Sequence, residues 1–279
     1  MKQFAKYVNH KGESIELNGK YLRLNNGQLQ DWGLSHTAIN GRTASFSRPR
    51  KEIAVEAVIV AASSVEGAAI KNYLYDVAIV DVEANKPGRL YIGDWYMEGF
   101  FVRSNKGRWW YTDRVAEYSL AFLTDSPMWT REHDFSFWPI SSNDDVGLNH
   151  PYDFEHNYGA VKSGAHALSN PSVLAAPAKI DIYGPVEKPR ITIGENVYEV
   201  DTVVPAGGVL TIDSVKRTII KKDKYGAISN CFQYRVGNQR KGGGSYIFEP
   251  IPAGVSRVTW DGSFGFDLTL YEKRDEWRW

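Results

Sequence analysis

A strictly alternating run of apolar residues near the C-terminal end places the strongest constraint on the fold. The run spans residues 264–271, and its apolar members are Phe264, Phe266, Leu268 and Leu270. A period of two places these side chains on one face of a β-strand, where a core can bury them. Val258 and Trp260 alternate with polar residues in the same way, just before an Asp-Gly turn signal. The sequence therefore predicts neighbouring antiparallel strands that are buried on one side.

Short segments of the same kind fill the rest of the region 171–279. Strands are expected, among other places, at 178–183, 190–193, 209–213 and 246–248, with Gly-, Asn- and Asp-containing turns between them. Regularly spaced short strands without a helical pattern are typical of an antiparallel two-layer sandwich. We therefore expect a C-terminal β-sandwich domain over 171–279.

The region 1–138 combines strand patterns with one helical pattern. Ser63 and Glu66 form a capping-box pair, whose side chains accept hydrogen bonds from the amides at a helix start. Apolar residues then continue at helical spacing from Val65 to Val77. Strands are expected at 53–61, 78–82, 95–104 and 109–123, with a turn at 105–107. These elements predict an N-terminal β-sandwich with one helix packed on it.

Residues 139–170 are predicted to connect the two domains, because Ser, Asn, Asp, Gly and His dominate there. Four histidines lie in or beside this connection, with acidic residues among them: His133, His150, His156 and His166. Their spacings match neither a two-histidine helical site nor a zinc finger. We expect a polar linker, with a metal site as the alternative.

The segment 33–51 is polar and basic, and it is predicted to be a long hairpin or arm that projects from the core. Asn40 and Gly41 supply a turn in its middle. Its basic residues are Arg42, Arg48, Arg50 and Lys51. Such an arm can contact a neighbouring subunit or an anionic surface, although charge runs are often merely solvated. Trp109, on a predicted strand of the same domain, is a second candidate for a subunit contact.

Charge and cysteine content exclude several functional classes. Lys and Arg total 33, as do Asp and Glu, so no net field favours nucleic acid or an anionic membrane. The single Cys231 cannot form an internal disulfide, and its position between Asn230 and Phe232 in a strand-like run favours a small core residue over a nucleophile. The N-terminus lacks the apolar stretch of a signal peptide, and no run approaches a membrane span. We expect a protein that stays where it is made or leaves within an assembly.

Catalytic signatures are missing from the sequence. It contains no Gly-x-Ser-x-Gly elbow, no His-Glu-x-x-His motif and no segment that singles out a pair of acids for glycoside hydrolysis. The Gly-rich segment 241–245 lacks the spacing of a phosphate-binding loop. We therefore expect no enzyme activity, no catalytic residue and no cofactor.

The order of elements resembles the distal tail proteins of long, non-contractile-tailed phages that infect Gram-positive hosts. The resemblance spans essentially the whole chain and depends on turns and core positions. In the first domain it rests on the segment 15–19 (IELNG) and on the order of strand, capped helix and Trp-rich strand. In the second it rests on the segments 205–213 (PAGGVLTID) and 251–260 (IPAGVSRVTW) and on the closing strand. The resemblance implies a ring-forming N-terminal β domain and a galectin-like C-terminal sandwich.

The resemblance also implies a structural role in the virion. Members of the family form a hexameric ring that joins the tail tube to the host-adsorption apparatus and leaves a channel for DNA. The expected partners are further copies of the chain, the tail tube protein, the tape-measure protein, and the tail-tip hub and receptor-binding proteins. The expected location is the tail tip of the virion, after synthesis in the host cytoplasm. A sandwich that binds host cell-wall sugars on exposed Trp residues is the alternative, and a cell-wall glycosidase has the least support.

Overall fold

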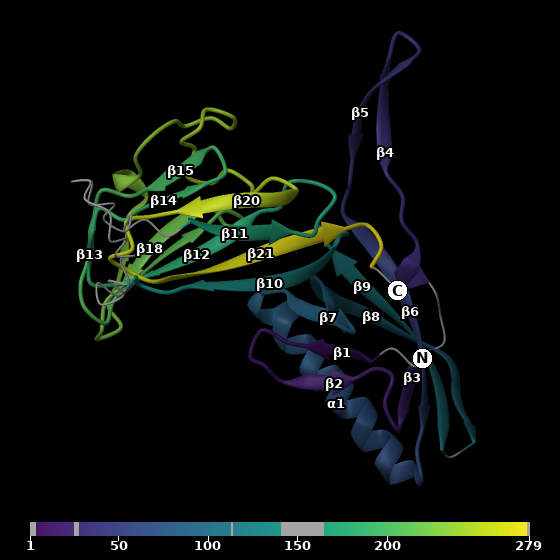
Figure 1. Ribbon diagram of the computed structural model, residues 1–279. Helices are drawn as coiled ribbons and strands as arrows, with labels where there is room; N and C mark the ends of the chain where they lie inside the picture. The colour runs from purple at the N-terminus through teal and green to yellow at the C-terminus, as the bar shows by residue number, and fades with distance from the viewer. Residues whose placement is uncertain (1–3, 25–27, 113, 141–164, 278–279) are drawn as a thin grey trace, which may run out of the picture. The chain divides into compact units, whose positions relative to one another are not determined.

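β-Strands dominate the structure, a computed structural model that describes residues 4–24, 28–112, 114–140 and 165–277 (Figure 1). The predicted mainly β class is confirmed, and among the described residues α1 (Ser64–Ala84) is the only α-helix. Contacts divide the chain into two compact units, one formed by 1–131 together with 273–279 and the other by 132–272. The chain therefore changes unit twice, within β10 (Trp129–Phe137) and within β21 (Phe266–Arg274).

The first unit is built on two antiparallel ladders that share one long strand. Its strands are β1 (Ala5–Val8), β2 (Ser14–Glu16), β3 (Leu22–Leu24), β6 (Lys51–Val60), β7 (Gly88–Ile92), β8 (Trp95–Thr112) and β9 (Val115–Thr124), with a short 3-10 turn η1 (Gln28–Gln30) after β3. One ladder has the order β2-β1-β7-β8 and the other the order β3-β6-β9-β8. The inner faces of both ladders bury a common core that includes Tyr7, Leu90, Val55 and Phe122.

Helix α1 begins as predicted but extends further. The hydroxyl of the N-cap Ser63 accepts a hydrogen bond from the Glu66 amide at 3.2 Å, and Glu66 Oε2 accepts one from the Ala62 amide at 2.6 Å. The predicted strand at 78–82 is wrong, because the helix continues to Ala84 and ends at Asn85 in the left-handed region (φ 49°). Ala, Ile and Val suit a strand and a buried helix equally, so the local pattern could not separate the two.

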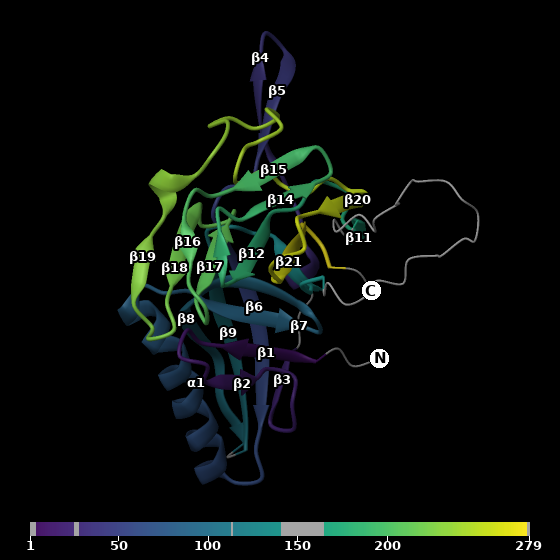
Figure 2. The same cartoon turned by 60° about the vertical axis from the view of Figure 1, so that its left-hand side comes forward.

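The buried face of α1 also differs from the prediction. Leu74, Val77 and Asp81 are buried against β8, β2 and β6, whereas Val65 and Tyr73 are exposed. Figure 2 shows the helix lying along one side of the strands of this unit.

Strand β8 passes through the predicted turn at 105–107, so that prediction is wrong. The chain reverses between Thr112 and Val115 instead. Pairing with β9 shifts register at three places along β8, between 101 and 103, 106 and 108, and 108 and 112. Such irregularities accommodate a glycine inside a strand, which explains how Gly107 fits there.

The second unit is a two-layer antiparallel sandwich. One sheet has the order β19-β18-β17-β12-β21-β10, and the other the order β11-β20-β14-β15, with β13 and β16 as a separate pair. Besides β10 and β21, its strands are β11 (Ala165–Asn170), β12 (Ala178–Tyr183), β13 (Val186–Glu187), β14 (Arg190–Ile193), β15 (Asn196–Glu199), β16 (Val203–Val204), β17 (Val209–Asp213), β18 (Thr218–Lys222), β19 (Ile228–Asn230) and β20 (Gly254–Thr259), and η2 (Phe232–Tyr234) is a 3-10 turn.

The four alternating apolar residues of 264–271 are buried as predicted, and Phe266 stacks on Phe137 with ring centroids 4.5 Å apart. Cys231 is also buried.

Two segments of the second unit differ from the prediction. Residues 246–248 do not form a strand, because the Asn196 side chain donates to Tyr246 O at 2.9 Å and accepts from Tyr246 N at 3.1 Å. The Asn196 side chain therefore forms the hydrogen bonds to the Tyr246 main chain that a neighbouring strand would otherwise form. Residues 165–170, predicted to belong to the connection, form strand β11 and pair with β20.

We expect limited proteolysis to cut first between residues 141 and 164, where the sequence is rich in Ser, Asn, Asp and Gly. The boundaries at 138 and 171 stay a prediction that this cut would test. Because Trp277 packs edge-on against Trp129 in the first unit (4.8 Å), both pieces should still elute together under native conditions. Denaturing gels would then resolve two stable fragments. First cleavage inside 176–271 would contradict the predicted boundary.

Candidate assembly surfaces

The segment 33–51 contains a two-stranded hairpin, as predicted. Strands β4 (Ser35–Ile39) and β5 (Arg42–Ser47) pair in antiparallel register, with a shift after Thr37. Asn40 (φ 52°) and Gly41 (φ 75°) make the tip, because both occupy the left-handed backbone region that this type of two-residue turn needs. Every residue of both strands is exposed, and Figure 1 shows the ribbon extending away from the other strands of its unit.

The hairpin exposes apolar and basic side chains together. Ile39 is 65% exposed and Phe46 is 67% exposed, and Arg42 lies beside the tip. The sequence from Trp32 to Lys51 contains no acidic residue. An isolated two-stranded ribbon has marginal stability in water, since neither face is buried. The hairpin is therefore suited to being covered by another surface, preferably one that carries carboxylates.

Three of the predicted basic residues hold the base of the hairpin within its own unit. Arg48 forms a two-pronged ion pair with Asp275, in which Nε–Oδ1 is 2.5 Å and Nη2–Oδ2 is 2.7 Å. This hydrogen bonding to Arg48 lowers the pKa of Asp275. Arg50 lies 3.4 Å from Asp125, and Lys51 Nζ donates to Asp31 O at 2.9 Å.

The residues predicted to contact a neighbouring subunit thus lie in different places. Arg48, Arg50 and Lys51 lie at the base, Arg42 lies at the tip, and their role in a subunit contact stays a prediction. Trp109 belongs to β8, but its side chain is outside the described part of the structure. Sequence reasoning missed Asp275, because no local pattern links it to a residue so far away in the chain.

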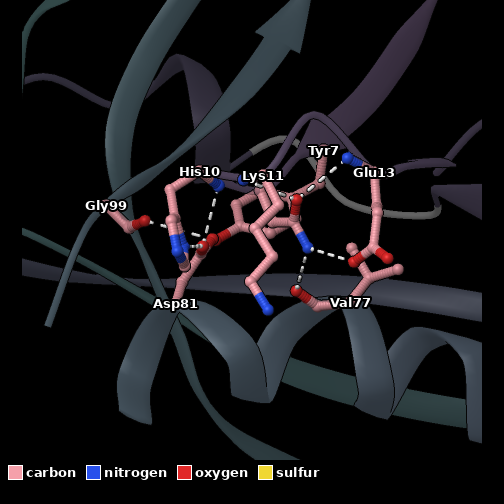
Figure 3. A network of polar contacts seen from close by, with 8 residues as sticks. Tyr7, His10, Lys11, Glu13, Val77, Asp81 and Gly99 are labelled. Atoms are coloured by element: carbon pink, nitrogen blue, oxygen red, sulfur yellow. Dashed lines mark hydrogen bonds and ion pairs between the residues drawn. The ribbon is translucent and has the colours of Figure 1, made fainter. Parts of the chain in front are cut away.

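A buried polar cluster fixes α1 to the strands of the first unit (Figure 3). Asp81, which is fully buried, accepts hydrogen bonds from the Tyr7 hydroxyl and from the His10 amide at 2.8 Å, and its Oδ1 lies 2.6 Å from His10 Nδ1. Burial, and then the bond to Asp81, raises the pKa of Tyr7. The hydroxyl therefore stays protonated and acts as a fixed donor, which is a structural role.

A second set of bonds continues this cluster along the turn after β1. The Asn9 side chain donates to Glu13 Oε2 at 2.8 Å and to the helix carbonyl of Val77 at 3.3 Å (Figure 3). Its carbonyl oxygen accepts from the amides of Lys11 and Glu13. The turn between β1 and β2 is thereby held against α1.

A pocket of about 420 Å³ lies between α1 and strands β8 and β9. Its walls are largely apolar, and the Tyr118 hydroxyl is buried there without a hydrogen-bond partner among the described residues. Burial raises the pKa of Tyr118. Lys71, Arg103 and Lys106 also line the pocket. A basic lining does not complement the basic hairpin, so we assign this pocket no part in a hairpin contact.

The histidines considered as metal ligands do not gather within the described residues, and no group of at least three potential ligands is found there. His133 Nε2 lies 2.9 Å from the buried Glu272, and the His166 ring packs 5.1 Å from that of Trp260. His150 and His156 lie outside the described residues. In the part of the chain that is described, no helix combines the length and apolar character of a membrane span.

Comparison with known proteins finds matches in structure but not in sequence. No family model and no curated protein matches the chain. The crystal structure of the Dit protein of phage SPP1, described as a paradigm of the hub adsorption apparatus in phages that infect Gram-positive bacteria, matches with a TM-score of 0.58 at 9% identity. That match covers 98% of this chain and 100% of the SPP1 chain.

The baseplate of phage p2 in its activated conformation gives two further matches. With calcium the TM-score is 0.57, with strontium it is 0.59, and the identity is 12% in both. Each match covers 99% of this chain and 99% of the baseplate chain. Over nearly its whole length, the chain therefore has the fold of phage adsorption-hub and baseplate proteins.

Proposed function

We propose that the protein is a structural subunit of a phage tail tip, which forms a hexameric ring between the tail tube and the host-adsorption apparatus. The ring would leave a channel through which DNA passes. The observation that carries the proposal is the match of fold over 98% of this chain and all of the SPP1 hub protein, which includes both units. Fold alone does not define function, so the exposed hairpin provides the second support.

The partners follow from this position in the particle. They are further copies of the chain, the tail tube protein, the tape-measure protein, and the tail-tip hub and receptor-binding proteins. The protein would be made in the host cytoplasm and would reside at the tail tip of the virion. Its task is assembly, and no enzymatic step is proposed.

A closed ring requires a heterologous contact, in which one patch of a subunit meets a different patch of the next. We assign the hairpin β4–β5 to the first patch. The second patch is the end of β8 and β9 that contains Trp109 and Glu117, outside the stretch of these strands that lines the basic pocket. Glu117 is exposed on β9, so it offers a carboxylate on this second patch. Arg42 is suited to such a carboxylate, because its planar guanidinium can donate two hydrogen bonds at once.

We expect the purified chain to form closed rings of hexameric mass. Light scattering across a range of concentrations would measure the mass, and negative-stain images would show closure and symmetry. A chain that stays monomeric alone and also in the presence of tail tubes would contradict the proposal. Rings that form only on tail tubes would support the proposed function but would show that the chain does not assemble by itself.

A further inference from the structure

A second pocket, of about 530 Å³, lies within the second unit. It forms where β10 ends, where β12 ends and where the chain turns into β21, and its lining combines aromatic rings and prolines with a few polar groups. Its volume lies in the usual range of small-ligand sites, about 300 to 1,000 Å³. The residues that matter for its chemistry are Ser136, Trp138, Tyr183, Ser263 and Asp267.

Two aromatic rings in this pocket remain accessible to solvent. Trp138 is 77% exposed and Tyr183 is 42% exposed. The main chain beneath Trp138 is fixed on both sides, because Phe137 stacks on Phe266 and the Ile140 amide donates to Gly262 O at 2.9 Å. A large ring held on a rigid main chain can bind a flat apolar face with little loss of conformational entropy.

The polar groups lie beside these rings. The Tyr183 hydroxyl donates to Asp267 Oδ2 at 2.6 Å, and this bond raises the pKa of Tyr183 to about 12. The Asp267 carboxylate is half-buried and is an acceptor for further hydroxyl donors. Ser136 and Ser263 are exposed and add hydroxyl groups. The pocket thus offers both a stacking surface and hydrogen-bonding groups.

The charge of the lining residues limits the chemical class of ligand that the pocket can bind. None of the described residues that line it is Lys, Arg or His, and Asp267 contributes a negative charge. Phosphate or carboxylate groups would therefore be repelled and would find no cation. A ligand with apolar C–H faces and many neutral hydroxyl groups satisfies every observation.

We propose that this pocket binds a neutral hexopyranose unit of a polysaccharide, with the sugar face on Trp138 and its hydroxyls on Asp267. The site would add glycan contact to the assembly role proposed above, but it does not depend on ring formation. Because the pocket is open and its polar groups are few, a single site should bind weakly, in the millimolar range. Repetition of the site around a ring would strengthen attachment to a polymer through multivalency.

The experiment uses the full-length chain and defined oligosaccharides. Saturation-transfer NMR and tryptophan fluorescence would be recorded with neutral glucose, galactose and N-acetylglucosamine oligomers, and with poly(glycerol phosphate) as the anionic polymer. We expect saturable binding of at least one neutral glycan and none of the phosphate polymer. Trp138→Ala should weaken binding about tenfold or more, since stacked rings contribute on that scale.

Tyr225→Ala is the matched control, because Tyr225 is 83% exposed in the same unit and does not line the pocket. It should leave binding unchanged. Trp138→Ala should keep the thermal unfolding temperature, because an exposed ring contributes little to the core, so a loss of binding would not reflect misfolding. Absence of binding to all neutral glycans, equal loss in the two variants, or preference for the phosphate polymer would each overturn the proposal. None of these results would bear on whether the chain forms rings.

Discussion

Deletion of the hairpin residues 35–47 is expected to convert the proposed hexameric ring into single chains. The deletion removes the exposed apolar pair Ile39 and Phe46, together with Arg42, from the first patch of the proposed contact. Ser35 and Ser47 are paired across the hairpin, so a short Gly-Ser link can join the remaining ends without displacing the base. Light scattering should report a fall from hexameric mass to the mass of one chain.

The first unit should stay folded after this deletion, because neither hairpin strand belongs to its buried core. Circular dichroism and the unfolding temperature would check that point. A milder variant, Arg42→Glu, should weaken the ring while leaving the hairpin in place, and Glu117→Arg in the same chain should restore part of the assembly. Intact rings after deletion of 35–47 would exclude the hairpin from the contact.

Gly88→Ala is expected to destabilise the first unit by about 2 to 5 kcal/mol, through overpacking and disruption of a buried hydrogen bond. An added methyl group would lie 2.3 Å from Asp81 Oδ2, and also too close to the Tyr7 hydroxyl. Both atoms are buried and joined to each other, so neither can move into solvent. Urea unfolding followed by fluorescence would measure the loss.

Gly33→Ala is the matched control, since nothing lies within 4 Å of a methyl group at that position. It should change stability by less than about 0.5 kcal/mol, as is usual for surface substitutions. Adding Tyr7→Phe to Gly88→Ala removes the Tyr7 hydroxyl oxygen, one of the three atoms nearest to the added methyl group. The double variant should therefore lose less stability than the sum of the single losses. Additive losses would show that the cluster is not the cause.

The elements that could be predicted from sequence are those with strong local signals. The period-two pattern of 264–271 identified the buried face of β21, and Ser63 with Glu66 marked the start of α1. The hairpin tip followed from Asn40 and Gly41, since few other residues adopt their backbone conformation. In each case the physical cause lies within a few residues of its effect.

The elements that were mispredicted depend on distant residues. The segment 246–248 has strand-like composition, yet the Asn196 side chain takes the hydrogen bonds of a neighbouring strand. The base of the hairpin is held by Asp275, near the far end of the chain. No local pattern marks Asp81, because its partners Tyr7 and His10 come from a different part of the sequence. Such contacts arise only when the fold brings the residues together.

The double passage of the chain between its units has a mechanical consequence. The chain leaves the first unit within β10 and returns within β21, so two covalent segments join the units. A tensile load that pulled the units apart would be divided between these segments instead of stretching one tether. To separate the units, the load would have to pull Trp277 away from its packing on Trp129 while it also stretches β10. The second connection therefore adds tensile strength that a single linker between two domains would not provide.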